Sequence, residues 1–308
     1  MIPKVSLRAP AKINLYLQIL GRREDGYHLL ASLMQKLELF DFIEIEAAAE
    51  GITLACPDSE LPQNEDNIAF RAARLFFSTY SPKISVYGGA HITLRKFIPV
   101  AAGLGGGSSD AAGVLVGLDK LFHTGIERKK LAALGASLGA DVPFFVYDSP
   151  VAWATGIGDS LEPALGFENG LVLLVNPGFP VSTKFIYENF ALTLDKKKIN
   201  LKNSHSNDKA SEKNLFLNKV FMPAAIRNDL EQVTTSLYKE LLDIKEHLLE
   251  GGALCAMMSG SGPTFFALFD KRADEQARSC YEMMRKHYRQ VFLVQPMLED
   301  HCRFCSTG

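Results

Sequence analysis

Apolar and polar residues alternate along two segments of the chain, with the period of a β-strand that has one buried face. These segments run from Leu37 to Glu46 and from Ile84 to Leu94. Short apolar runs bounded by polar residues predict three further strands, over 171–175, 264–269 and 291–294. Both halves of the chain are therefore expected to contribute strands.

Apolar residues recur with helical spacing between these strands. Asp66 or Asn67 is expected to cap a helix over 68–80, and a helix over 127–138 is expected to end at Gly139. Later helices are predicted near 228–250 and 273–287. Because helices and strands do not alternate in regular βαβ units, the pattern indicates the α+β fold class.

A glycine-rich loop precedes another helical pattern. Residues 99–112 read Pro-Val-Ala-Ala-Gly-Leu-Gly-Gly-Gly-Ser-Ser-Asp-Ala-Ala. Glycines permit positive φ angles and let several N–H groups approach one anion. Ser108, Ser109 and Asp110 stand where helix caps are expected, so the positive end of the following helix would face the same anion. The loop is predicted to bind phosphate.

Neither of the two common glycine signatures accounts for this loop. A Walker A loop ends in Gly-Lys-Ser/Thr, and the chain contains no Gly-Lys pair. A dinucleotide fingerprint requires Gly-x-Gly-x-x-Gly, but Ser108 occupies the last position. The remaining interpretations are a third type of phosphate loop or a flexible turn followed by an ordinary helix cap.

Polar residues interrupt an apolar strand pattern near the N-terminus, in Pro10-Ala11-Lys12-Ile13-Asn14-Leu15. Residues two apart share one face of a strand, so Lys12 and Asn14 could together hold a substrate hydroxyl and neutralise developing charge. A snorkelling surface lysine is the alternative.

An acid and a second glycine loop extend the pattern. Asp141, in Leu-Gly-Ala-Asp-Val-Pro-Phe-Phe, is either a helix cap or a fixed carboxylate that accepts a hydroxyl proton. The run Ser-Gly-Ser-Gly-Pro-Thr over 259–264 is a tight turn, which could pack against bound phosphate.

Charge and cysteine content narrow the class of protein. The 308 residues carry a formal charge of −2 with both signs mixed, which gives no reason to expect nucleic acid or a membrane as a partner. Five cysteines indicate a reducing, cytoplasmic setting, with Cys302 and Cys305 as tail thiols rather than metal ligands. No metal site is expected from the protein alone. A polar, lysine-rich segment near 195–214 is expected to be a solvated insertion, although RNA contact is an alternative.

The two glycine loops together resemble the GHMP kinase superfamily of small-molecule kinases. The segments Pro10–Leu15, Asp25-Gly26-Tyr27-His28 and Leu138–Pro143 further resemble the branch whose substrate is a cytidine diphosphate-linked methylerythritol, in the non-mevalonate isoprenoid precursor pathway. The match spans nearly the whole chain.

The resemblance implies a GHMP kinase fold of two domains with a substrate cleft between them. Residues 1–165 would form an ATP-binding domain like the second domain of ribosomal protein S5, and residues 166–308 a ferredoxin-like domain. ATP, accompanied by Mg²⁺, would lie along the first loop, which comprises Pro99, Val100, Ala101, Ala102, Gly103, Leu104, Gly105, Gly106, Gly107, Ser108 and Ser109.

The resemblance also implies roles for individual residues. Asp141 would be the base and Lys12 its electrostatic partner in phosphoryl transfer to the 2-hydroxyl of the methylerythritol unit. Tyr27 and His28 would recognise cytosine with help from Tyr187, although a hairpin turn at Glu24-Asp25-Gly26 with incidental neighbours is the alternative. The erythritol would contact Asn14, with Thr183 and Lys96 as further candidates.

Two other functions remain open at this stage. A GHMP kinase acting on mevalonate or a related alcohol would keep the glycine loop without needing a cytosine site. A non-catalytic RNA-binding or nucleotide-sensing module would share the S5-like fold, but it would need neither Lys12 nor Asp141. The 195–214 insertion and the 301–308 tail have no counterpart in the resemblance. The expected state is a monomer or weak homodimer.

Overall fold

The computed structural model describes residues 2–23, 26–80, 87–196 and 225–298. The Cys302 and Cys305 tail and most of the predicted polar insertion lie outside this part of the chain. None of the described helices is both long and apolar enough to cross a membrane. Cys56, Cys255 and Cys280 are buried free thiols.

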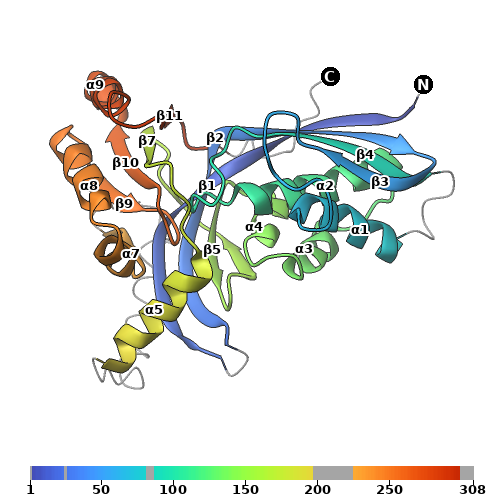
Figure 1. The fold of residues 1–308 in the computed structure, drawn as a ribbon, viewed down its shortest axis with the longest axis horizontal. Coiled ribbons are helices and arrows are strands. Elements are labelled where there is room, and N and C mark those ends of the chain that lie inside the picture. The colour runs from blue at the N-terminus through green and yellow to red at the C-terminus, as the bar shows by residue number, and fades with distance from the viewer. Residues whose placement is uncertain (1, 24–25, 81–86, 197–224, 299–308) are drawn as a thin grey trace.

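Two long antiparallel strands form the centre of the first sheet (Figure 1). They are β1 (Lys4–Arg22) and β2 (His28–Ala48). The sheet is completed by β3 (Glu50–Ala55), β4 (Gly88–Arg95), β5 (Val151–Thr155), β6 (Ser160–Pro163) and the short β8 (Arg227–Asn228). The register of β1 against β2 shifts between Pro10 and Ala11 and between Asn14 and Tyr16. Such irregularities re-aim side chains, and these two bracket Lys12 and Asn14.

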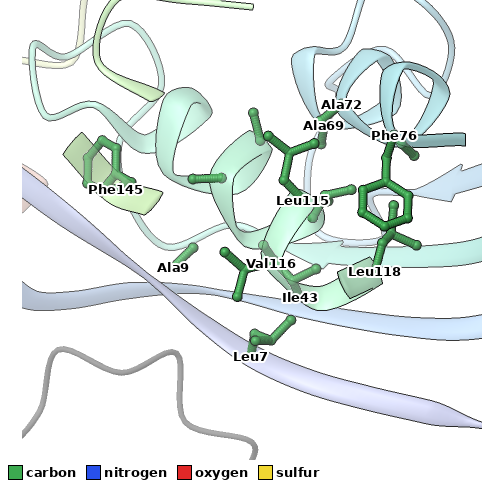
Figure 2. Close-up of a cluster of buried hydrophobic side chains, with 14 of the residues drawn as sticks. Leu7, Ala9, Ile43, Ala69, Ala72, Phe76, Leu115, Val116, Leu118 and Phe145 are labelled. Carbon is green, nitrogen blue, oxygen red and sulfur yellow. The ribbon is translucent and has the colours of Figure 1, made fainter. Parts of the chain in front are cut away.

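Four helices pack on this sheet, in the order α1 (Ile68–Tyr80), α2 (Gly106–Phe122), α3 (Arg128–Ala136) and α4 (Val142–Val146). Figure 2 shows Leu115, Val116 and Leu118 of α2 between α1 and the strand residues Leu7 and Ile43. A Cβ atom on Gly117 would lie 2.6 Å from Leu7 Cδ1, so the glycine permits a close approach of α2 to the sheet. This packing holds α2 against the sheet.

The second sheet has four antiparallel strands in the order β11, β7, β10, β9. Their bounds are Gln290–Val294, Gly170–Asn176, Phe265–Asp270 and Cys255–Met258. The helices of this half are α5 (Thr183–Lys196), α7 (Glu231–Leu237), α8 (Glu240–Glu250) and α9 (Asp274–Met284), with a short 3₁₀ turn, η3 (Lys271–Ala273).

The strands of the second sheet are apolar on both faces because both faces are covered. Leu173 and Val175 pack in the cluster that contains the helical residues Leu241 and Ile244. Leu174 and its neighbours on the opposite face pack instead in a cluster with residues of β1 and β2. The two sheets are therefore joined by a shared apolar core.

The α+β class is confirmed, as are the predicted strands over 171–175, 264–269 and 291–294. Asn67 caps α1, since its Oδ1 accepts from the N–H of Ala69 at 2.9 Å. The chain passes from the first sheet to the second between β6 and β7, but β8 returns to the first sheet. The domain boundary at 165 remains a prediction.

Two expected elements differ from those observed. The strand predicted over 37–46 is the second half of β2, which is 21 residues long. The helix predicted near 228–250 is divided into β8, α7 and α8, because the side chain of Asn228 donates to the carbonyl oxygens of Met258 and Gly260 at 2.7 Å each. These two hydrogen bonds hold the segment at Asn228 against β9 and the second glycine loop, so the helix does not begin there.

Candidate active site

A cavity of about 1170 Å³ lies where the glycine loop, β1, the β1–β2 hairpin and the start of α5 meet. Its volume exceeds the usual range for a site that holds one small ligand. Most of the predicted site residues line it: Lys12, Asn14, Tyr27, His28, Lys96, Pro99, Val100, Ala101, Ala102, Gly103, Gly105, Gly106, Gly107, Ser108, Asp141, Thr183 and Tyr187. Leu104 and Ser109 are buried instead and do not line the cavity.

Two glycines give the first loop its path. Gly103 has a φ of 75°, and a Cβ atom there would lie 2.2 Å from the carbonyl oxygen of Ser259. Gly105 has a φ of 72°, and its Cβ atom would lie 2.9 Å from Lys12 Cγ. Positive φ favours glycine at both positions, and a side chain would meet the backbone of Ser259 at Gly103 and the side chains of Lys12 and Phe145 at Gly105. The main-chain N–H of Lys12 donates to Leu104 O at 2.9 Å, which holds the loop against β1.

The helix after the loop begins three residues earlier than a cap at Ser108 would place it. α2 starts at Gly106, Gly105 occupies the cap position without a side-chain cap, and the N–H of Ser109 donates to Gly105 O at 2.9 Å. The expectation that Ser108, Ser109 and Asp110 cap this helix is therefore wrong, because the glycines themselves form its first turn. The N–H groups ahead of Ser109 have no intrahelical acceptor and remain available to an anion.

Lys12 and Asp141 lie together at the cavity wall. Lys12 is only 4% exposed, its Nζ donates to Asn14 Oδ1 at 2.6 Å, and the same Nζ lies 3.2 Å from Asp141 Oδ2. Asn14 in turn donates from Nδ2 to Ser32 Oγ at 2.8 Å. The alternative of a snorkelling surface lysine is wrong, since the Lys12 ammonium is buried against these partners.

Asp141 stands at the start of the short helix α4, but its carboxylate forms no side-chain cap bond there. Asp141 therefore occupies the cap position of α4, as that interpretation expected, but its carboxylate makes no capping hydrogen bond. Its side chain is 34% exposed and lines the cavity, so one carboxylate can contact both Lys12 and a ligand.

A buried ionic cluster supports the glycine loop from beneath. Lys96 Nζ contacts Asp41 Oδ2 and donates to Asp110 Oδ2 at 2.6 Å. The other Asp41 oxygen, Oδ1, accepts from the N–H groups of Phe97 and Ile98 at 2.6 and 2.9 Å. The cluster therefore ties β2, the loop and α2 into one unit.

Burial and the neighbouring charges raise the pKa values of Lys96 and Asp110 in this cluster. Burial opposes the charge on Lys96, but Asp110 and Asp41 outweigh it, so the pKa of Lys96 is raised overall. Burial raises the pKa of Asp110 to about 8, with Asp41 adding to the effect and Lys96 opposing it. Within the described residues, Asp110 Oδ1 and Ser109 Oγ are buried without a hydrogen-bond partner.

The hairpin end of the cavity carries aromatic rings. The ring centroids of His28 and Tyr187 are 5.0 Å apart, which joins the start of β2 to α5. In Figure 1, α5 runs beside the hairpin end of β1 and β2. Tyr27 is 60% exposed, and Gly26 before it has a φ of 89°. Glu24 and Asp25, part of the predicted turn, lie outside the described residues.

The shifted pKa values of His28 and Tyr187 favour the neutral forms of both side chains at the hairpin end of the cavity. Burial, followed by the charge of Arg22, lowers the pKa of His28, so its imidazole is neutral near pH 7. Burial, followed by the charge of Asp141, raises the pKa of Tyr187. A neutral imidazole and a neutral phenol present a face and hydrogen-bonding groups suited to an uncharged base.

The second glycine loop packs on the first and reaches α5. Ser259 Oγ donates to Gly103 O at 2.8 Å, and Ser261 Oγ lies 2.8 Å from Thr183 Oγ1. Gly260 and Ser261 also line the cavity. The loop therefore links the phosphate-binding segment to the start of α5.

Sequence reasoning missed several members of this site. Asp41, Asp110 as a partner of Lys96, and the cavity residues Arg22 and Lys184 were not singled out. Asp41 did leave a sign, because it occupies the buried register of β2, two positions before Ile43. An acid at a buried strand position needs a partner.

Models of known families match both halves of the chain. The GHMP kinases N terminal domain matches residues 67–149, and the GHMP kinases C terminal model matches residues 206–290. The first match contains the glycine loop and Asp141, and the second contains the 259–264 loop.

Two curated relatives extend the similarity over almost the full chain. The 4-diphosphocytidyl-2-C-methyl-D-erythritol kinase of Syntrophus aciditrophicus is 45% identical over 282 residues, which is 92% of this chain and 95% of the relative. Its counterpart from Clostridium botulinum strain Loch Maree is 40% identical, covering 94% and 98%. The chain belongs to this family of GHMP kinases. It is therefore a small-molecule kinase that uses ATP, which overturns the alternative of a non-catalytic RNA-binding module.

Solved structures agree on the fold of this kinase. A crystal structure of 4-(cytidine 5'-diphospho)-2C-methyl-D-erythritol kinase has a TM-score of 0.74 at 32% identity and covers 94% of this chain and 98% of its own. Homoserine kinase from Cytophaga hutchinsonii has a TM-score of 0.70 at 18% identity, covering 96% of each chain. At such identity the homoserine kinase shows only a shared fold.

Proposed function

We propose that this kinase transfers the γ-phosphoryl group of ATP to the 2-hydroxyl of 4-diphosphocytidyl-2-C-methyl-D-erythritol, forming the 2-phosphate and ADP. The observation that carries the proposal is a single cavity that joins three groups: the glycine loop, the Lys12 and Asp141 pair, and the His28 and Tyr187 rings. Close relatives named for this substrate support it. The cavity-lining residues of the 99–109 loop, which exclude Leu104 and Ser109, bind the phosphates, and the rings bind the base.

The nucleotide binds at the start of α2. The free N–H groups of the first helical turn and the positive end of the helix dipole attract the phosphates. Gly103 and Gly105 allow the loop to pack closely against Ser259 and Lys12, which sets the position of these N–H groups. The cluster of Lys96, Asp41 and Asp110 holds this loop in place before ATP arrives, so little ordering is needed on binding.

Magnesium fits this end of the cavity. Mg²⁺ prefers oxygen ligands and is commonly held by one or two carboxylates together with substrate phosphates. Asp110 lines the cavity, and its buried Oδ1 has no partner among the described residues, so this oxygen would hold the ion once the carboxyl group has released its proton. When bound, the ion supplies neutralisation of the phosphate charge.

Asp141 and Lys12 act on the acceptor hydroxyl. Asp141 accepts the proton as the hydroxyl oxygen forms its bond to the γ-phosphorus and the bond from that phosphorus to the ADP oxygen breaks. Lys12, 3.2 Å from Asp141, orients the carboxylate and offsets negative charge at the reacting oxygens. Asn14 accepts a hydrogen bond from the ammonium of Lys12 and lines the same cavity, where it contacts the erythritol. Thr183, at the start of α5, also lines this cavity and is a further contact for the substrate.

The rings determine substrate recognition. Cytosine stacks against Tyr27 or Tyr187, and His28 hydrogen-bonds to its edge. Stacking on a base contributes roughly 1–3 kcal/mol, enough to distinguish a cytidyl substrate from an alcohol without a base.

Product analysis tests this assignment. Incubation with the cytidyl substrate, ATP and Mg²⁺ is expected to give ADP and a product with one added phosphoryl group, located on the 2-hydroxyl by ³¹P NMR coupling. A phosphate attached elsewhere on the methylerythritol unit would refute the proposed geometry of Asp141 and the acceptor hydroxyl.

A further inference from the structure

Lysine and arginine side chains line the cavity at four positions with different surroundings. They are Lys12, Arg22, Lys96 and Lys184. Lys12 and Lys96 each contact carboxylates, and Arg22 donates to the carbonyl oxygen of Gly26 at 3.4 Å. Of these cations in the described part of the chain, Lys184 alone has no ion pair or hydrogen bond. Its charge is therefore available to a ligand.

Neighbours of Lys184 on α5 contact two different parts of the cavity wall. Thr183, the preceding residue, lies within hydrogen-bond distance of Ser261 in the second glycine loop. Tyr187, three residues later and so on the same helix face, contacts the ring of His28. Lys184 therefore lies between the part of the cavity that adjoins the glycine loops and the part that holds the aromatic rings.

The proposed substrate has its diphosphate at the corresponding place, because the diphosphate links the cytidine to the methylerythritol. Resting on the proposed function, we infer that Lys184 binds the diphosphate of the acceptor substrate and makes the kinase favour a cytidine diphosphate-linked alcohol over one joined to a neutral group. A lysine ammonium attracts phosphate oxygens through charge-assisted hydrogen bonds. The N–H groups of the first turn of α5 add to this attraction.

The inference makes Lys184 a specificity residue rather than a catalytic one. Asp141 and Lys12 contact the hydroxyl, whereas Lys184 contacts a part of the substrate that does not react. Its loss should weaken substrate binding in the ground state and the transition state alike, raising KM with little change in kcat.

Calorimetric titration with cytidine and with CDP separates the base from the diphosphate. Both titrations contain a saturating non-hydrolysable ATP analogue and Mg²⁺, so that CDP reports the acceptor site rather than the ATP site. The measured quantity is the ratio of the cytidine Kd to the CDP Kd. Lys184→Met is compared with Lys286→Met, an exposed lysine outside the cavity lining.

Lys184→Met is expected to lower this ratio by about tenfold or more, with the cytidine Kd unchanged, while Lys286→Met keeps the wild-type ratio. An unchanged ratio in Lys184→Met would overturn the inference. Absence of cytidine binding in the wild-type protein would instead refute the proposed base site, and the inference with it. The two failures are therefore distinguishable, because only the second abolishes cytidine binding by the wild type.

Discussion

At the scale of single residues, the pairing of Lys12 with Asp141 is the centre of the account. The ammonium of Lys12 is buried, so removing its carboxylate partner would leave that charge without compensation. Here the lysine is fixed by Asn14, while the carboxylate remains partly exposed to the cavity. The arrangement presents a carboxylate to a hydroxyl without leaving the lysine charge unpaired.

Asp141→Asn removes the proton acceptor but keeps the shape of the side chain. We expect kcat to fall by about 10²–10⁴, the usual contribution of a general base, with ATP affinity nearly unchanged. Steady-state kinetics and equilibrium ATP binding measure the two effects. Asp148→Asn is the control, because Asp148 is exposed beyond the end of α4 and does not line the cavity. Wild-type turnover in Asp141→Asn would remove this residue from the mechanism.

His28 should affect the substrate and not the nucleotide. His28→Ala is expected to raise KM for the cytidyl substrate with little change in KM for ATP, because His28 lies at the ring end of the cavity. An unchanged KM would place the cytosine site elsewhere.

The lowered pKa of His28 adds a pH test. Because burial lowers the pKa of His28, a larger share of its imidazole stays neutral at pH 6.5 than in an unshifted imidazole, which would be half protonated there. The affinity for cytidine, which carries no titrating phosphate, should therefore fall with a midpoint below pH 6.5 as the pH is lowered from 7.5. A binding change with its midpoint near pH 6.5 would contradict the lowered pKa.

At the scale of elements, the first glycine loop is a rigid unit between β1, α2 and the second glycine loop. Gly103 contacts the backbone of Ser259, so a side chain cannot be accommodated by rotamer changes. Gly107, by contrast, has ordinary helical backbone, and its added Cβ atom would lie 3.5 Å from Ile68. Replacing each glycine by alanine therefore distinguishes a position that needs positive φ, Gly103, from one that does not, Gly107.

Gly103→Ala is therefore expected to lower the free energy of unfolding by about 2 kcal/mol or more, through strain at positive φ and the clash with Ser259. Gly107→Ala is expected to leave it unchanged or raise it slightly, because alanine favours a helix over glycine. Denaturant unfolding measures both. Equal stability of the two variants would show that the loop does not need its positive φ at Gly103.

The sequence predicted elements better than their ends. Apolar periodicity located α1 and α2, and short apolar runs located the strands of the second sheet, because their buried faces pack in the apolar cores. It placed the start of α2 too late, since serines are better caps than glycines in isolation, and here the packing of Gly103 and Gly105 decides the path. The sequence pattern predicted only the second half of β2. The first half is buried on both faces, so its apolar and polar residues do not alternate.

At the scale of the whole molecule, the site is assembled from residues far apart in the chain. Lys12 and Asp141 meet across the first sheet and its helices, and His28 meets Tyr187 across the two halves. Residue spacing carries no information on such contacts, so these pairs were expected only through the family resemblance. The ion pairs of Lys96 with Asp41 and Asp110 were missed for the same reason, and Lys184 was missed because nothing local distinguishes it from a surface charge.

The fold alone does not determine the substrate of this kinase. Homoserine kinase from Cytophaga hutchinsonii and mevalonate kinase from L. major share the architecture, with TM-scores of 0.70 and 0.66 at 18% and 13% identity. What should set this chain apart is the ring end of the cavity, with Tyr27, His28 and Tyr187. Specificity is therefore the property of the whole molecule that most needs measurement.

ADP release with Mg²⁺ and ATP, measured for a panel of acceptors, tests the central claim most directly. The panel is 4-diphosphocytidyl-2-C-methyl-D-erythritol, the erythritol phosphate lacking its cytidyl group, mevalonate and homoserine. The account predicts rapid ADP formation with the cytidyl substrate alone. ADP formation with mevalonate or homoserine but not with the cytidyl substrate would contradict it, leaving the phosphate loop in place and the acceptor site wrongly assigned.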